Sequence, residues 1–140
     1  MNIREITIPV GVKEPFSVLH TSDNHLCLAD ERNDERKIRL AKERQYAFTK
    51  GHPERLVERA EEIFAYAREN NLTLLHTGDL IDFVSEANLD YTKKLMEGAD
   101  VFVAAGNHEF SLYVGEAWED EAYKAQSFEH VKEAFPGDFW

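Results

Sequence analysis

The sequence predicts an α/β fold, a β-sheet with mostly parallel strands joined by crossover helices. Short apolar runs alternate along the chain with helical patterns, which is the order of β–α–β units. Such crossovers are right-handed and leave their strands parallel. The chain has 140 residues, of which 43% are apolar and 31% charged, so it can bury a core as one domain. We therefore expect a single domain over residues 1–140.

The elements of this fold are expected in a regular order. The expected strands are 3–10, 16–20, 72–76 and 101–105. The expected helices lie near 34–47, from Pro53 to about 70, from Ser85 to about 97, and over 116–135, where Pro136 and Gly137 end the last one. Pro53 suits a first helical position, and Ser85 is a good N-cap. One apolar stripe at helical spacing supports the second helix, and it consists of Leu56, Val57, Ala60, Ile63, Phe64 and Ala67.

A long polar insertion separates the second expected strand from the second helix. Residues 26–51 are rich in charge, and long connections in compact domains are often functional covers. We expect this segment to be a lid or an insertion. Its basic part, 32–50, is either a solvated helix face or a clamp for substrate.

Polar side chains follow each of the three later strands. They are Asp23 and His25, Asp79 and Asp82, and Asn107 and His108. The carboxyl ends of adjacent parallel strands meet at one edge of a sheet, so these side chains are expected around one crevice. Asp23 and His25 can reach one ion, and a carboxylate with an imidazole suits zinc, manganese or iron better than calcium. Asp79 could bridge two ions through its two oxygens.

The three motifs resemble those of the calcineurin-like metallophosphoesterase superfamily. That family's pattern is Asp-x-His, then Gly-Asp-x-x-Asp, then Gly-Asn-His-Asp/Glu. The corresponding stretches here are Asp23-Asn24-His25, Gly78-Asp79-Leu80-Ile81-Asp82 and Gly106-Asn107-His108-Glu109. Together they make chance a poor explanation.

The resemblance implies a site with two divalent metal ions, such as manganese, iron or zinc. Asp23, His25 and Asp79 would bind one ion, and Asp79 and Asn107 the second. His108 would be the catalytic residue that assists the leaving oxygen, and Asn107 and His108 would contact the substrate. The implied reaction is hydrolysis of a phosphomonoester or phosphodiester by a water that the two metals activate.

Asp82 and Glu109 are expected to support these ligands without binding metal. The resemblance covers about residues 16–110 and implies the first half of a four-layer αββα sandwich. The family's later histidine ligands, including Gly-His-x-His, have no counterpart here. We therefore expect either a missing C-terminal half or self-association, because an incomplete sheet leaves an open edge and face.

Two other functions remain as alternatives. One is a non-catalytic, truncated fragment that folds, self-associates and binds metal weakly or not at all. The other is an aspartyl-phosphate phosphatase with Asp23 as the nucleophile, which gives no role to residues 106–109.

Composition limits the partners and the location. A net charge of −11 disfavours nucleic acid as a partner, because a broad nucleic-acid surface is basic. No apolar run approaches the roughly 20 residues of a membrane helix. The single cysteine, Cys27, forms no internal disulfide and suits a reducing compartment, so we expect a cytoplasmic protein. Cys27 itself is expected near the core. His20 and His76 are expected as hydrogen-bonded core residues.

Overall fold

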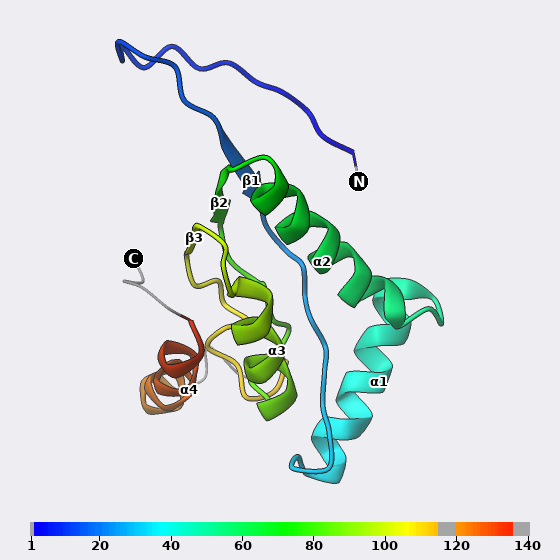
Figure 1. The fold of residues 1–140 in the computed structure, drawn as a ribbon. Helices are drawn as coiled ribbons and strands as arrows, with labels where there is room; N and C mark the ends of the chain where they lie inside the picture. Colours follow the sequence, from blue (N-terminus) through cyan, green and yellow to red (C-terminus); the bar gives the residue numbers. More distant parts are fainter. Residues whose placement is uncertain (1, 115–119, 136–140) are drawn as a thin grey trace.

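The computed structural model describes residues 2–114 and 120–135 as a three-stranded sheet with helices packed on it (Figure 1). The elements are β1 (Val18–Thr21), α1 (Glu35–Thr49), α2 (Glu54–Glu69), β2 (Thr73–His76), α3 (Glu86–Met96), β3 (Val101–Val103) and α4 (Glu121–Ala134). The strands are parallel, in the order β1-β2-β3. The predicted α/β fold with parallel strands and crossover helices is confirmed.

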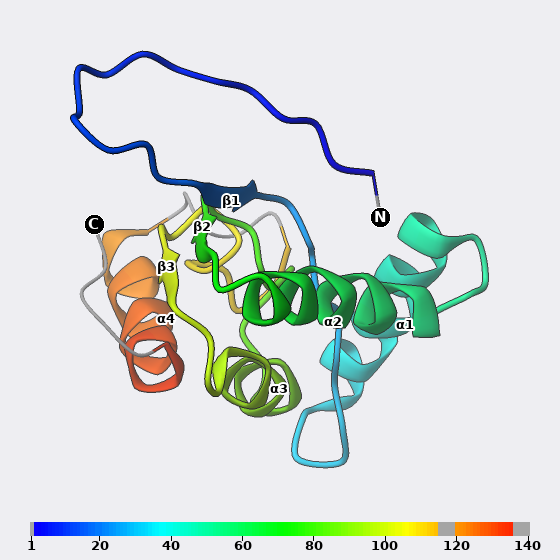
Figure 2. The ribbon, with the colours of Figure 1, turned by 45° about the horizontal axis from the view of Figure 1, so that its top comes forward.

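The register of the strands gives the sheet one buried and one open face. Leu74 of β2 lies between Leu19 and Val101 in the register, and it is fully buried in the core. The next residue of each strand points to the opposite face of the sheet, because side chains alternate along a strand. There, Phe102 of β3 is 58% exposed. Figure 2 shows the helices on one side of the sheet and the N-terminal segment arching over the other.

The predicted apolar stripe of α2 packs against the buried face. Ala60, Phe64 and Ala67 are buried in the same core cluster as Leu74. Burying a side chain of the size of Phe64 stabilises a fold by about 1.5–3 kcal/mol. α2 also contacts α1 and α3, so it holds the helical layer on the sheet.

Helix α3 begins after the expected capping residue, Ser85. The Ser85 hydroxyl accepts a hydrogen bond from the backbone N–H of Asn88, as an N-cap does. α4 begins after its own cap, Asp120. Predicted helical residues 116–119, and the breakers Pro136 and Gly137, lie outside the described residues. No described helix has both the length and the apolarity needed to cross a membrane.

Two expectations about the N-terminal part are wrong. Residues 3–10 form no strand, and apolar side chains such as Ile6 and Ile8 are exposed. The alternation is real, but a strand also needs a neighbour to accept its hydrogen bonds, and the described chain places none beside this segment. His20 is exposed instead of buried in the core, because it lies on the open face of the sheet and bonds to Thr77.

Candidate metal centre

The loops that follow β1 and β2 run side by side and are hydrogen-bonded to each other. The N–H of Asp23 donates to the carbonyl of Gly78 at 3.0 Å, and the N–H of His25 donates to the carbonyl of Asp79 at 2.9 Å. These bonds continue the pairing of β1 and β2 beyond the strand ends. The three side chains that the sequence predicts as ligands of one ion are thereby held next to one another.

The same three residues have unusual backbone angles. Their φ values are 56° for Asp23, 48° for His25 and 57° for Asp79. Five non-glycine residues in the described chain have positive φ, and these are three of them. Left-handed backbone costs roughly 1–3 kcal/mol at such positions and concentrates at functional sites. Asp and His are among the side chains that tolerate it best.

The donor atoms of Asp23, His25 and Asp79 form a cluster that fits a metal ion. One ligand atom from each lies within 4.8 Å of the others. The His25 Nε2 and Asp23 Oδ1 atoms are 3.6 Å apart, which is too long for a strong hydrogen bond. That spacing suits two ligands that each lie about 2.0–2.2 Å from one ion. A hydrogen bond with Ser22 lowers the pKa of Asp23, so its carboxylate is charged at neutral pH.

Asp82 lies behind His25 and sets the orientation of its ring. Its carboxylate is fully buried and accepts a 2.9 Å hydrogen bond from His25 Nδ1, which leaves Nε2 for a metal. Burial alone would raise the pKa of Asp82, but hydrogen bonds from Arg44 and His25 hold it below its usual value. The hydrogen bond to Asp82 in turn raises the pKa of His25.

A second cluster, His25, Asp82 and His108, also brings three possible ligands within 4.8 Å. Arg44 already donates to both oxygens of Asp82, at 2.6 and 2.9 Å. A cation bound there would compete with the guanidinium for the Asp82 carboxylate and would break the hydrogen bond from His25 Nδ1. We therefore regard this cluster as a hydrogen-bond network, and the cluster around Asp79 as the metal candidate.

Glu109 fastens the loop after β3 to the loop after β2. Its fully buried carboxylate accepts hydrogen bonds from the backbone N–H groups of Asp79, Leu80, Ile81 and Gly106, at 2.7 to 3.2 Å. A Cβ added to Gly106 would lie 2.2 Å from Asp79 Oδ1. Only glycine allows the two loops to approach this closely.

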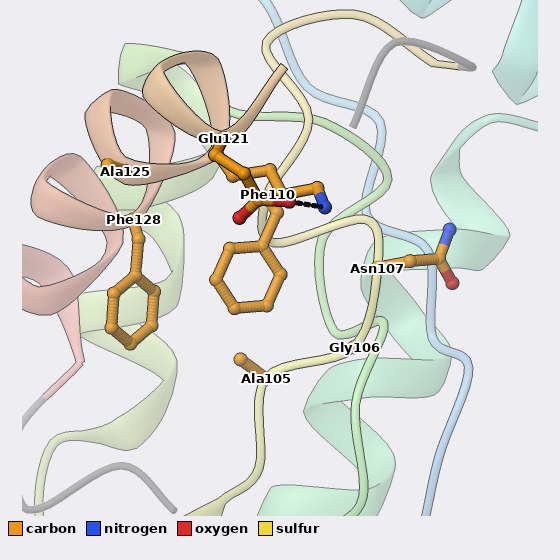
Figure 3. Close-up of a pocket in the computed structure, with 8 residues that line it drawn as sticks. Ala105, Gly106, Asn107, Phe110, Glu121, Ala125 and Phe128 are labelled. Atoms are coloured by element: carbon orange, nitrogen blue, oxygen red, sulfur yellow. Dashed lines mark hydrogen bonds and ion pairs between the residues drawn. The ribbon is translucent and has the colours of Figure 1, made fainter. Parts of the chain in front are cut away.

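His108 and Asn107 extend from the same loop after β3. His108 Nδ1 lies 2.7 Å from the carbonyl oxygen of Asp82. A carbonyl can only accept, so Nδ1 carries a proton and Nε2 is the nitrogen left for chemistry. The backbone N–H of His108 also donates to Asp79 Oδ1 at 3.1 Å. Asn107 is exposed, and Figure 3 shows its amide pointing away from Phe110.

Several contacts of the site were not identified from the sequence. Arg44 lies in the basic stretch 32–50, but nothing in the pattern singled it out as the partner of Asp82. Phe48 stacks on the ring of His25, with centroids 5.1 Å apart. Cys27 is buried as expected, its Sγ donates to the carbonyl of His25, and burial raises its pKa.

Carboxylates and imidazoles gathered at the carboxyl edge of a parallel sheet are an arrangement that metal-dependent hydrolases use. A family model, calcineurin-like phosphoesterase, matches residues 16–138. The chain belongs to this family, so the resemblance drawn from the motifs is confirmed. Membership supports metal-dependent hydrolysis of phosphoesters in general, with divalent metals as cofactors. Searches of the curated proteins and of the solved structures found no significant match.

Proposed function

We propose that this chain hydrolyses a phosphomonoester or phosphodiester with a water that two divalent metal ions activate. The observation that carries the proposal is the cluster of donor atoms from Asp23, His25 and Asp79. These residues would hold one ion, and Asp79 with Asn107 the second, with manganese, iron or zinc as the candidates. When bound, such ions lower the pKa of a water and neutralise charge on the phosphoryl oxygens.

The charge of the protein supports a role for metal. A net charge of −11 repels an anionic phosphoester unless a local positive charge reverses the sign. Arg44, which contacts Asp82 behind His25, is already occupied by two hydrogen bonds to that carboxylate. Bound divalent ions would provide the positive charge that the substrate requires.

His108 is proposed as the group that protonates the leaving oxygen. Its Nδ1 is held by the carbonyl of Asp82, so the proton would come from Nε2. The Asp82 carboxylate Oδ1 also lies 3.2 Å from Nδ1. General acid catalysis of this kind contributes about 10²–10⁴-fold to a rate. Asn107 and His108 would both contact the substrate, while Asp82 and Glu109 support the ligands.

The test is metal content together with hydrolysis of two aryl phosphates. The purified chain is loaded with manganese, its metal is measured by mass spectrometry, and p-nitrophenyl phosphate is compared with bis-p-nitrophenyl phosphate. We expect Asp79→Asn to lose both metal and activity, and the matched control Asp90→Asn, at the exposed partner of Arg32, to keep both. We expect His108→Gln to keep its metal and lose about 10²–10⁴-fold in rate.

Some results would contradict the proposal. If the wild-type chain is inert and Asp79→Asn binds as much metal as wild type, the metal centre is wrong. The alternative of a non-catalytic chain that binds metal weakly or not at all would then describe the protein better.

Self-association is a further part of the proposal. The open face of the sheet carries Val18, 41% exposed, and Phe102, 58% exposed. Ile6 and Ile8 of the N-terminal segment are more than 70% exposed. Exposed apolar groups in this number favour contact with a second copy of the chain. Sedimentation velocity at several concentrations should show dimers or larger species, and a monomer at every concentration would contradict this.

We also propose that residues 26–51 act as a cover over the site within one domain of residues 1–140. Two contacts support the proposal: α1 supplies Arg44 to Asp82, and Lys37 Nζ donates to the carbonyl of Val84. If the segment closes over a substrate, manganese and phosphate together should slow backbone hydrogen exchange in α1. Unchanged exchange in α1 would contradict a covering role.

A cytoplasmic location is the last part of the proposal. It is supported by the single cysteine, Cys27, which is a free, buried thiol, as suits a reducing compartment. Recovery of the protein outside the cytoplasmic fraction of its cells would contradict it.

A further inference from the structure

A cavity lies beside the metal candidate, between the loop after β3 and helix α4. Its volume is about 600 Å³, within the range of sites that bind small molecules. Its lining residues are Ala105, Gly106, Asn107, Phe110, Glu121, Lys124, Ala125 and Phe128. Three of these eight are alanine or glycine, whose small size leaves the space open, and two are phenylalanines. Figure 3 shows Phe110 and Phe128 side by side in this cavity.

The two phenylalanines give the cavity a flat aromatic wall. Their rings stack with centroids 5.0 Å apart and planes inclined by 29°. That separation is too small for another ring to enter between them, so a planar ligand would stack on the outside of the pair. Both rings are only partly buried. The Lys132 ammonium lies 5.1 Å from the centroid of Phe128, so a ligand that stacks on Phe128 would displace it, while the ring of Phe110 offers further aromatic surface.

The charged groups of the cavity neutralise each other. Lys124 Nζ and Glu121 Oε1 form an ion pair at 2.7 Å. The walls therefore combine aromatic surface with a neutral rim, which suits the uncharged organic part of a molecule better than its phosphate.

The cavity is connected to the proposed metal centre through two of its own lining residues. Gly106 lies against Asp79, where an added Cβ would meet Oδ1 at 2.2 Å, and Asn107 is a proposed ligand of the second ion. Glu109 fixes this loop by accepting from the N–H groups of both Gly106 and Asp79. Phe110 follows Glu109 directly in the chain, so this half of the aromatic wall is tied to the loop that contacts Asp79.

We propose that this cavity binds the organic group of the phosphoester, and that this group is a flat aromatic ring. The phosphoryl group would lie at the proposed metal site of Asp79 and Asn107, and the ring would stack on Phe110 and Phe128. Because the cavity is a substrate site only if Asp79 binds metal and phosphoester, the proposal rests on the proposed function. An aryl ester and a nucleotide share this chemistry, and binding experiments can separate them.

The test compares non-hydrolysable phosphonates by calorimetry on the manganese-loaded chain. Phenylphosphonate should bind about tenfold more tightly than methylphosphonate, because stacking and burial of the ring add to the same phosphonate contacts. A nucleoside 5′-phosphonate is the second aromatic probe. The aromatic probe that binds more tightly shows whether the ring belongs to an aryl ester or to a nucleotide.

Variants of α4 test how much the aromatic wall contributes to binding. Phe128→Leu keeps an apolar side chain in the core contact and should reduce the preference for phenylphosphonate from about tenfold to about twofold. Methylphosphonate should bind as it does to wild type. His130→Ala, at an exposed position of the same helix that does not line the cavity, should change neither. Circular dichroism confirms that each variant is folded.

The outcomes distinguish the two proposals. Equal affinity of all three probes for the wild-type protein would overturn the aromatic subsite while leaving the metal centre intact. A Phe128→Leu variant that keeps the tenfold preference would also overturn it. Failure of every probe, including methylphosphonate, to bind in the presence of manganese would overturn the proposed function and the subsite together.

Discussion

Replacing Glu109 with glutamine should destabilise the protein strongly although it changes only one atom of the side chain. The Glu109 carboxylate accepts hydrogen bonds from four backbone N–H groups, two on each oxygen. A glutamine amide has one oxygen and one NH2 group. Two of the four N–H groups would therefore lose their acceptor and face another donor.

The size of the effect follows from these contacts. A buried donor without an acceptor costs about 1–3 kcal/mol, so two cost roughly 2–6 kcal/mol. Burial raises the pKa of Glu109, and hydrogen bonds from Asp79, Ile81 and Gly106 oppose that rise. The charge is thus costly to bury, and removing it returns part of the loss. We expect a net decrease of about 2–4 kcal/mol in the free energy of unfolding.

Urea unfolding at pH 7, followed by far-ultraviolet circular dichroism, measures this difference. Glu129→Gln is the matched control, because Glu129 is exposed on α4 and pairs only with Lys132 in the described contacts; its stability should stay close to that of wild type. Manganese affinity should also fall in Glu109→Gln, since the backbone of Asp79 is one of the groups released. Equal stability of the two variants would refute the view that Glu109 holds the loops together.

Three other substitutions test separate features of the same fold. Arg44→Met should lower the free energy of unfolding by about 3 kcal/mol in urea titrations, because it leaves the buried Asp82 carboxylate without its guanidinium; Arg39→Met, at an exposed pair, should change little. Burial lowers the pKa of His76 to about 4, whereas an unfolded histidine titrates near 6.5, so stability should fall by up to about 3 kcal/mol as the pH drops from about 6.5 to about 4. A His76→Gln variant with the same pH dependence of its urea midpoint as wild type would contradict this. Gly106→Ala should cost about 1–3 kcal/mol and weaken manganese binding in calorimetry, because the new methyl group meets a carboxylate oxygen.

Local patterns were sufficient to predict most of the elements. The stripe through Phe64 predicted α2, and Ser85 predicted the start of α3, because helical spacing and N-capping depend on residues close in the sequence. The strand predicted at 3–10 is absent for the opposite reason. Its alternation satisfies local preference, but pairing depends on a partner that local sequence does not identify.

The candidate metal centre shows the same division between local and distant information. The motifs placed Asp23, His25 and Asp79 at strand ends, and the parallel register brings them together. The pairing of Arg44 with Asp82 joins residues 38 positions apart, and the hydrogen bonds of Glu109 span 28 to 30 positions for the loop after β2. Such contacts depend on how helices and loops pack, and one sequence carries no periodic signal for them.

The unfavourable features of the site are all held by these distant contacts. Asp23, His25 and Asp79 have left-handed backbones. Each is less favourable than the same residue with a negative φ. Asp82 and Glu109 are fully buried carboxylates, which are stable only when hydrogen-bonded. Each buried carboxylate bonds to the strained segments, Asp82 through the ring of His25 and Glu109 through the backbone of Asp79. The strain and the buried charge therefore support one geometry, in which three donor groups converge.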